Sequence, residues 1–169
     1  MATSYPFSHI AVIGIGLIGT SIVHASKYHN LPVTFAAFDN NPDVRAEAAD
    51  LLSHIKITTT LQQAVEDAEL VILAVPVGVM QQVIKDIAPY LRPGCVITDT
   101  GSTKRSVIRD VLPFVPEACT FIPGHPLAGT EFSGPAAGFA SLFEKRYWLI
   151  LPNGSPEHKV AGLATFLSD

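Results

Sequence analysis

The chain has 169 residues, a length that fits one domain with a substantial core. Hydrophobic residues make up 48% and charged residues 15% of the sequence, which indicates a globular protein and excludes a disordered one. With 11 basic and 15 acidic residues the net charge is −4, so nucleic acid is a poor candidate partner. The one local basic cluster, Lys104, Arg105 and Arg109, is predicted to be a solvated helix face.

Strand-like and helix-like runs alternate along the chain. The runs predicted as strands are residues 9–13, 33–38, 55–58, 70–75, 96–99, 120–122 and 148–151. The runs predicted as helices are residues 17–28, 42–53, 61–66, 78–91 and 103–112. This alternation predicts an α/β fold, with a doubly wound, mostly parallel sheet and helices on both of its faces.

The first predicted strand runs directly into Gly14-Ile15-Gly16-Leu17-Ile18-Gly19, a G-x-G-x-x-G turn that opens a helix. Gly14 allows the tight strand-to-helix turn, Gly16 lets a pyrophosphate approach the backbone, and Gly19 lets the helix lie close to the sheet. We therefore expect that no side chain fits at these three positions.

The helix that follows needs no basic residue to hold a phosphate, because its free backbone N–H groups and the positive end of its dipole point toward the ligand. Leu17 and Ile18, in its first turn, are predicted to bind the cofactor together with the glycines. Such glycines also occur in purely structural turns, but here a strand, a helix and a spaced acidic residue accompany them. The sequence thus predicts a dinucleotide site in a Rossmann-like sheet of order 3-2-1-4-5-6.

Asp39 ends the second predicted strand, about 20 residues after Gly19, where a carboxylate would accept hydrogen bonds from an adenosine ribose. Its charge would repel a 2′-phosphate, so NAD is predicted in preference to NADP. The alternative is structural, because residues 39–42 are also typical of a turn that leads into a helix.

Residues 70–75 are apolar without alternation, which is typical of a central strand buried on both faces. Val75 and Pro76, at the end of this run, are predicted to shape the wall beside the cofactor. Residues 124–145 are rich in glycine, proline and alanine and are expected to form a long irregular connection with a function. Ser155 is the predicted N-cap of a last helix, with Pro156 at its first position.

Cys95 and Cys119 belong to no metal-spaced pair and are predicted to be buried free thiols, and no cluster of histidines has the spacing of a metal site. No apolar stretch is long enough to cross a membrane, and the segment 11–23 lacks the basic flank of a signal peptide. We expect a cytoplasmic protein that binds neither metal nor membrane.

Four segments together resemble the nucleotide-binding half of the prephenate dehydrogenases and their arogenate-using relatives. They are residues 14–21, 74–76 and 99–104 and, as the most specific of them, Gly124-His125-Pro126-Leu127-Ala128-Gly129-Thr130-Glu131. The resemblance covers nearly the whole chain. It implies an NAD-dependent oxidative decarboxylation of prephenate or arogenate in the biosynthesis of tyrosine.

The resemblance also assigns roles by position. His125 matches a histidine that holds the C4 hydroxyl of the substrate and takes up its proton as hydride leaves, which suits an imidazole whose pKa lies near working pH. Ser102 matches a serine that hydrogen-bonds to this histidine and to the substrate; the alternative is an N-cap for the next helix. Thr130 and Glu131 match positions that line the substrate pocket, and the alternative is a solvent-exposed pair. Out of this context, His125 would be interpreted as a hydrogen-bonded loop histidine.

Family members continue beyond the length of this chain into a helical domain that forms a homodimer and supplies an arginine for a substrate carboxylate. We therefore expect residues 1–169 to be the cofactor-binding half, weak or inactive by itself. Two alternative functions stay open. One is another small-substrate NAD(P) oxidoreductase of similar fold, such as a 3-hydroxyacid dehydrogenase or a pyrroline carboxylate reductase, and the other is a non-catalytic NAD-sensing module.

Overall fold

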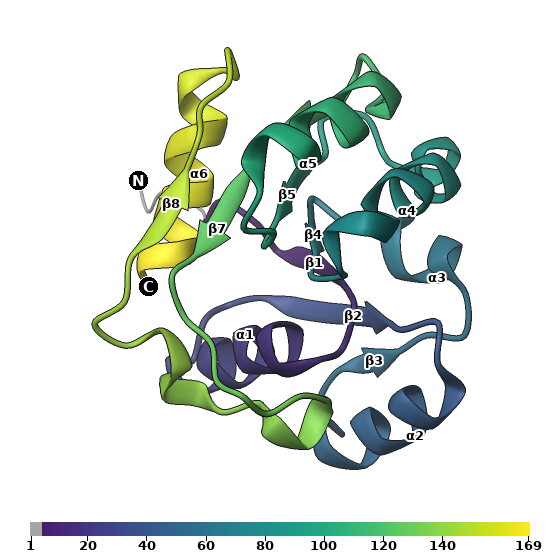
Figure 1. Ribbon diagram of the computed structural model, residues 1–169, viewed down its shortest axis with the longest axis vertical. Helices are drawn as coiled ribbons and strands as arrows, with labels where there is room; N and C mark the ends of the chain where they lie inside the picture. Colours follow the sequence, from purple (N-terminus) through teal and green to yellow (C-terminus); the bar gives the residue numbers. More distant parts are fainter. Residues whose placement is uncertain (1–4) are drawn as a thin grey trace.

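A six-stranded parallel sheet forms the centre of the computed structural model, which describes residues 5–169 (Figure 1). Its strands are β1 (His9–Ile13), β2 (Thr34–Phe38), β3 (Lys56–Ile57), β4 (Leu70–Leu73), β5 (Val96–Asp99) and β6 (Thr120–Phe121). They lie in the order β3-β2-β1-β4-β5-β6, and every neighbouring pair is parallel. The predicted fold class and strand order are confirmed.

Helices cover both faces of this sheet. One face carries α1 (Leu17–Tyr28), α2 (Pro42–Leu51) and α6 (Glu157–Ser168), and the other carries α3 (Leu61–Val65), α4 (Met80–Ile87) and α5 (Lys104–Val111). Side chains of β1 alternate between the two cores, with Ile10 and Val12 in the first and Ala11 and Ile13 in the second. The sheet is therefore buried on both sides, as the uninterrupted apolar run of β4 predicts.

The predicted strand at residues 148–151 is real but does not belong to the parallel sheet. β8 (Trp148–Ile150) pairs with β7 (Gly124–Pro126) in a separate antiparallel ribbon. The chain returns to β8 without a crossover helix, so the two strands pair antiparallel. The expectation of a wholly irregular segment at 124–145 is thus wrong at its start.

Between these two strands the chain passes over α1 and returns, as Figure 1 shows in green. Two 3-10 turns, Pro135–Ala137 and Ala140–Phe143, lie on this path and contact α1. The backbone N–H of Phe139 donates to the hydroxyl of Ser21 at 3.1 Å, and the position of a Cβ on Gly138 would lie 2.7 Å from Thr20 Cβ. This segment is therefore closely packed against the helix.

The predicted start of the last helix is wrong by one position. α6 begins at Glu157 with Pro156 as its N-cap, and no side chain caps it. The hydroxyl of Ser155 instead donates to the carbonyl of Phe121 at 3.3 Å, which joins this loop to β6. The Ser155 hydroxyl, which the sequence pattern predicts as a helix cap, is therefore engaged in a tertiary hydrogen bond with Phe121 instead.

The two cysteines are free thiols. Cys95 is buried, as predicted, and burial raises the pKa of its thiol to about 12, whereas Cys119 is only half-buried. None of the helices within residues 5–169 has both the length and the apolar composition needed to span a bilayer.

Candidate active site

The glycine turn after β1 has the close contacts that its sequence predicts at its two ends. Gly14 has φ of +98°, and a Cβ there would lie 2.4 Å from the carbonyl oxygen of Ala74. A Cβ on Gly19 would lie 2.1 Å from the carbonyl oxygen of Gly14. Both positions exclude a side chain, the first by backbone conformation and contact and the second because the helix lies against the turn.

Gly16 is different, because within residues 5–169 no atom other than those of Gly16 and its two chain neighbours lies within 4 Å of the position that its Cβ would take. The expectation that no side chain fits here is wrong for the protein by itself. The space beside Gly16 is open at the start of α1, a helix with no side-chain cap and no acidic residue in its first turn. Bare backbone with free N–H groups next to open space fits the pyrophosphate of a dinucleotide. Leu17 and Ile18, which begin α1, are half-buried at the same place.

Asp39 lies beside this turn at the end of β2. Its Oδ2 accepts a hydrogen bond from the backbone N–H of Ile15 at 3.0 Å, and its Oδ1 accepts one from Asn41 N at 3.0 Å. Asn41 in turn caps α2 by accepting from Asp43 N at 2.9 Å. The structural alternative for residues 39–42 is therefore confirmed, and the ribose role of Asp39 stays a prediction.

The loops that follow β4 and β5 adjoin the glycine turn. Val75 Cγ1 lies 3.0 Å from the position of a Cβ on Gly14, and Pro76 is exposed directly after it. A Cβ on Gly101, after β5, would lie 2.9 Å from Val77 Cγ2. The predicted residues after β1, β4 and β5 thus form a row at the carboxyl edge of the sheet, where ligands bind in this class of fold.

A buried ion pair extends this row to β7. Asp99, at the end of β5, is fully buried and pairs with Lys104, whose side chain is only 14% exposed. The Asp99 carboxylate also accepts from Gly101 N at 2.8 Å and from Gly124 N at 3.1 Å, and Lys104 Nζ donates to the carbonyl of Gly124. Burial lowers the pKa of Lys104, and the hydrogen bond and charge of Asp99 act in the opposite direction.

The prediction of a solvated helix face is therefore wrong for Lys104, although Arg105 and Arg109 are exposed. The sequence holds one signal for the pair: an aspartate follows three apolar or hydroxyl positions of a buried strand, and a lysine stands five residues later, at the first position of the next helix. That signal does not predict that both side chains also bond to the backbone of Gly124.

Ser102 lies exposed in the loop between β5 and α5. The N-cap of α5 is Thr103, and no side chain makes a capping hydrogen bond there. The N-cap alternative for Ser102 is wrong, so helix capping does not account for its hydroxyl.

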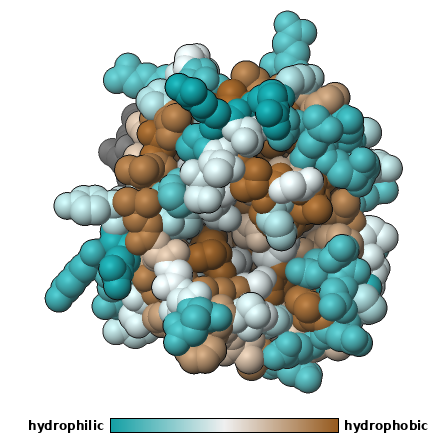
Figure 2. All heavy atoms as spheres, viewed as in Figure 1, coloured by the Kyte–Doolittle hydropathy of each residue, from teal (hydrophilic) through white to brown (hydrophobic). Residues whose placement is uncertain are grey.

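His125 is the middle residue of β7, half-buried and paired with Leu149 of β8. It belongs to a strand, not to a loop. Leu127 N donates to Tyr147 O at 2.8 Å, so Leu127 and Tyr147 form the next cross-strand pair on the face that carries His125. Leu127, Tyr147 and Leu149 are 44%, 79% and 47% exposed. Figure 2 shows hydrophobic residues gathered over the region that β7 and β8 occupy in Figure 1.

Thr130 and Glu131 are exposed in the chain that leaves β7. The Thr130 hydroxyl accepts from the backbone N–H of Phe132 at 3.2 Å. The alternative of a solvent-exposed pair agrees with this placement, and their contact with a substrate stays a prediction.

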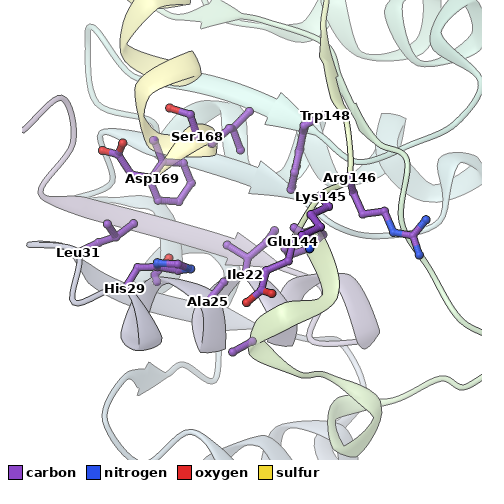
Figure 3. Close-up of a pocket in the computed structure, with 15 residues that line it drawn as sticks. Ile22, Ala25, His29, Leu31, Glu144, Lys145, Arg146, Trp148, Ser168 and Asp169 are labelled. Carbon is purple, nitrogen blue, oxygen red and sulfur yellow. The ribbon is translucent and has the colours of Figure 1, made fainter.

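A cavity of about 340 Å³ lies elsewhere, between α1, β8 and α6 (Figure 3). Ile22, Glu144 and Trp148 point into it in this view, and Asp169 lies at its rim. None of the residues predicted for cofactor or substrate lines it. It adjoins the later turns of α1, beyond the glycine end, and we do not assign the cofactor to it.

Comparison with known proteins shows the family to which the chain belongs. Residues 23–169 match the model of the family described as "Prephenate dehydrogenase, nucleotide-binding domain". The chain is 41% identical over 161 residues to a cyclohexadienyl dehydrogenase of Zymomonas mobilis, covering 95% of this chain and 55% of that protein. It is 34% identical to a prephenate dehydrogenase of Lactococcus lactis, covering 83% of this chain and 40% of that one.

Solved structures show the same likeness. A prephenate dehydrogenase of Aquifex aeolicus, in complex with hydroxyphenyl propionate and NAD+, superposes with a TM-score of 0.85 at 25% identity, over 99% of this chain and 57% of that chain. The arogenate dehydrogenase of Synechocystis shares the fold, with a TM-score of 0.85 at 21% identity. The chain spans about half the length of these relatives or less. The glycine turn has open space at Gly16, and His125 lies on a strand beside the same sheet edge. Because the family model matches most of its length, the chain belongs to the prephenate dehydrogenase family as its nucleotide-binding domain.

Proposed function

We propose that this chain is the cofactor-binding half of an NAD-dependent dehydrogenase that oxidatively decarboxylates prephenate or arogenate on the route to tyrosine. The observation that carries the proposal is the row of loops at the carboxyl edge, in which the glycine turn, the Ser102 loop and the His125 strand follow one another. The identity of 41% to a cyclohexadienyl dehydrogenase supports the substrate class.

The dinucleotide would lie with its pyrophosphate against Gly16 and the N–H groups of Leu17 and Ile18, where the space is open. Val75 and Pro76 would form the wall beside it. Asp39 supports NAD over NADP, because its carboxylate would accept hydrogen bonds from ribose hydroxyls and would repel a 2′-phosphate.

When bound, the nicotinamide supplies the acceptor for the hydride that leaves C4 of the substrate. His125 would hold the C4 hydroxyl and accept its proton, which a neutral imidazole can do near pH 7. Ser102 would hydrogen-bond to the same hydroxyl and to the imidazole, so that both face the nicotinamide end of the site. Carbon dioxide then leaves and the ring becomes aromatic. Thr130 and Glu131 would stand at the entrance of the substrate pocket.

The remaining length of the relatives would complete the enzyme. The exposed apolar side chains of Leu127, Tyr147 and Leu149 share the ribbon face of His125, and apolar patches of this kind mark surfaces that another element covers. We propose that a second, helical half covers this face, supplies the cation for a substrate carboxylate, and forms a homodimer. Two free cysteines are compatible with the reducing cytoplasm as the place of the reaction.

The test uses the His125→Asn variant in the complete enzyme, with His158→Asn on α6 as the matched control. We expect the turnover number for prephenate-dependent or arogenate-dependent NADH formation to fall by about 10²- to 10⁴-fold, the usual effect of losing a general base. The dissociation constant of NAD, from fluorescence titration, should change by less than about twofold, and His158→Asn should match the wild type in both. Wild-type turnover by His125→Asn would refute the assignment. A complete wild-type protein that binds NAD but turns over neither substrate would indicate a sensing module.

A further inference from the structure

The buried pair of Asp99 and Lys104 has no part in the function proposed above. Its charges are enclosed: Asp99 is fully buried, and the Lys104 side chain is 14% exposed. The pair joins three segments, because Asp99 Oδ2 accepts from Gly101 N at 2.8 Å, Asp99 Oδ1 accepts from Gly124 N at 3.1 Å, and Lys104 Nζ donates to Gly124 O. No other hydrogen bond within residues 5–169 joins the β5 loop to β7 through a charged side chain.

Stability alone is a weak reason for this arrangement. Burial of two charges costs desolvation free energy, and well-packed apolar side chains of similar volume are often as stable or more stable. A buried polar network whose members all have partners does, however, fix the backbone around it in one arrangement. The pair of Asp99 and Lys104 is therefore expected to fix the geometry of the backbone around it.

Gly124 is held on the edge of β7 that faces away from β8. In the ribbon, Leu151 N donates to Pro123 O at 2.9 Å and Leu127 N donates to Tyr147 O at 2.8 Å, so the odd-numbered residues of β7 pair with β8. The N–H and C=O of Gly124 point to the opposite edge of β7. There the N–H donates to Asp99 and the C=O accepts from Lys104. Asp99 and Lys104 thus make the two backbone hydrogen bonds of Gly124 that a neighbouring strand would otherwise make.

The fit at Gly124 leaves little freedom. A Cβ there would lie 2.9 Å from Asp99 O, 3.0 Å from Thr98 Oγ1 and 3.1 Å from Trp148 Nε1. The backbone of Gly124 is therefore packed directly against the end of β5. A displacement of the ion pair would therefore also displace the backbone of His125, which follows Gly124.

The same carboxylate holds the residue before Ser102. Gly101 N and Gly124 N bind the two oxygens of Asp99, so the backbones that precede Ser102 and His125 are fixed to one rigid group. We propose that Asp99 and Lys104 are positioning residues, which set the placement of His125 relative to Ser102 through Gly124 and Gly101. This inference rests on the proposed function, because it gives that relative placement a catalytic purpose.

The test compares three variants: Lys104→Met, the neutral double variant Asp99→Asn with Lys104→Gln, and Arg105→Met as a control on the exposed side of α5. Lys104→Met leaves a buried carboxylate without its partner and is expected to lose stability. The double variant removes both charges at similar volume and is expected to stay folded, which circular dichroism and thermal melting check.

In the 169-residue chain, amide hydrogen exchange and the imidazole NMR signals of His125 report the geometry without any assay of activity. We expect the Gly124 amide of the double variant to exchange about tenfold faster, the effect of one weakened hydrogen bond, and the His125 signals to shift. Arg105→Met should leave both unchanged. Unaltered exchange and unaltered His125 signals in the folded double variant would overturn the inference.

In the complete enzyme we expect the double variant to lose roughly 10- to 100-fold in kcat, as misplaced catalytic groups do, with the NAD dissociation constant within about twofold of the wild type. Wild-type kcat in a double variant whose Gly124 exchange is faster would also overturn the positioning role, while leaving the proposed function intact. Failure of the proposed function has a separate signature, namely full activity of His125→Asn.

Discussion

The carboxylate of Asp39 accepts a hydrogen bond from the backbone N–H of Ile15, with 3.0 Å between Oδ2 and N, and so joins the end of β2 to the middle of the glycine turn. Its other oxygen accepts from Asn41 N at 3.0 Å, at the entrance of α2. Asp39 is thus part of the local structure before any ligand arrives. If it also binds a ribose, one carboxylate serves the turn and the cofactor together.

These two roles can be separated by two substitutions at Asp39. Asp39→Asn keeps one carbonyl acceptor but removes the charge, so we expect roughly tenfold weaker NAD binding and a narrower gap between NAD and NADP, since hydrogen bonds to charged groups contribute about 1.5–3 kcal/mol. Asp39→Ala removes both acceptors and should in addition lower the free energy of unfolding by about 1 kcal/mol. Fluorescence titration with both cofactors and urea unfolding measure these effects. Asp43→Asn, on the exposed side of α2, is the control, and an unchanged preference for NAD in Asp39→Asn would remove the ribose assignment.

Gly16 and Gly19 belong to the same motif but should respond differently to alanine. Gly19→Ala places a Cβ 2.1 Å from the carbonyl oxygen of Gly14 and should lower the free energy of unfolding by about 1–3 kcal/mol. Gly16 has extended backbone angles and open space, so Gly16→Ala should change stability by less than about 0.5 kcal/mol. Its Cβ would nevertheless occupy the space assigned to the pyrophosphate, so NAD affinity should fall by about tenfold or more. Normal NAD binding by Gly16→Ala would show that the pyrophosphate does not rest there.

Ser102 and Thr103 are adjacent exposed residues with hydroxyl groups, and neither side chain caps α5. Alanine at either position should therefore change the free energy of unfolding by less than about 0.5 kcal/mol. Turnover distinguishes the two, because Ser102→Ala should slow it by at least about tenfold, the effect of a lost hydrogen bond in the transition state, and Thr103→Ala should not. Steady-state kinetics on the complete enzyme provide the measurement, and equal turnover numbers would remove Ser102 from the site.

The sequence predicts the parallel sheet well because its signals are local. The glycine turn defines β1 and α1, and the four fully buried residues of β4 form one uninterrupted apolar run. Prolines and capping residues mark helix ends within a few positions of the observed ones. Strand order then follows from the fold class that these elements define.

The parts that the sequence does not predict depend on partners far along the chain. β7 is the tripeptide Gly124–Pro126, which has no apolar alternation, and it becomes a strand only because β8 returns to it. Lys104 belongs to a basic cluster in the sequence, yet it is half-buried, because its ammonium group donates to Asp99 and to the carbonyl of Gly124, 20 residues away. The candidate site is similarly split: its glycines follow from local sequence, and the placement of His125 follows from tertiary contacts.

The buried thiol of Cys95 gives a pH-dependent prediction. Burial raises its pKa from an ordinary value of 9.0 to about 12, so the folded protein keeps the thiol protonated at pH values where the unfolded chain releases the proton. Below pH 9 the thiol is protonated in both the folded and the unfolded state, so it does not change the free energy of unfolding with pH. Between pH 9 and pH 12 the unfolded state binds fewer protons than the folded state, so the free energy of unfolding should fall as pH rises.

Two measurements check this. At pH 8 a thiol reagent should modify the half-buried Cys119 first and reach Cys95 only after urea unfolds the chain, because the thiolate is the reactive form. In urea unfolding from pH 8 to pH 10.5, Cys95→Ala should show a shallower loss of stability than the wild type. Tyr5, whose pKa burial also raises to about 12, should leave part of the loss in both proteins. Rapid labelling of Cys95 in the folded chain would contradict its burial in the core that also contains residues of α3, α4 and α5.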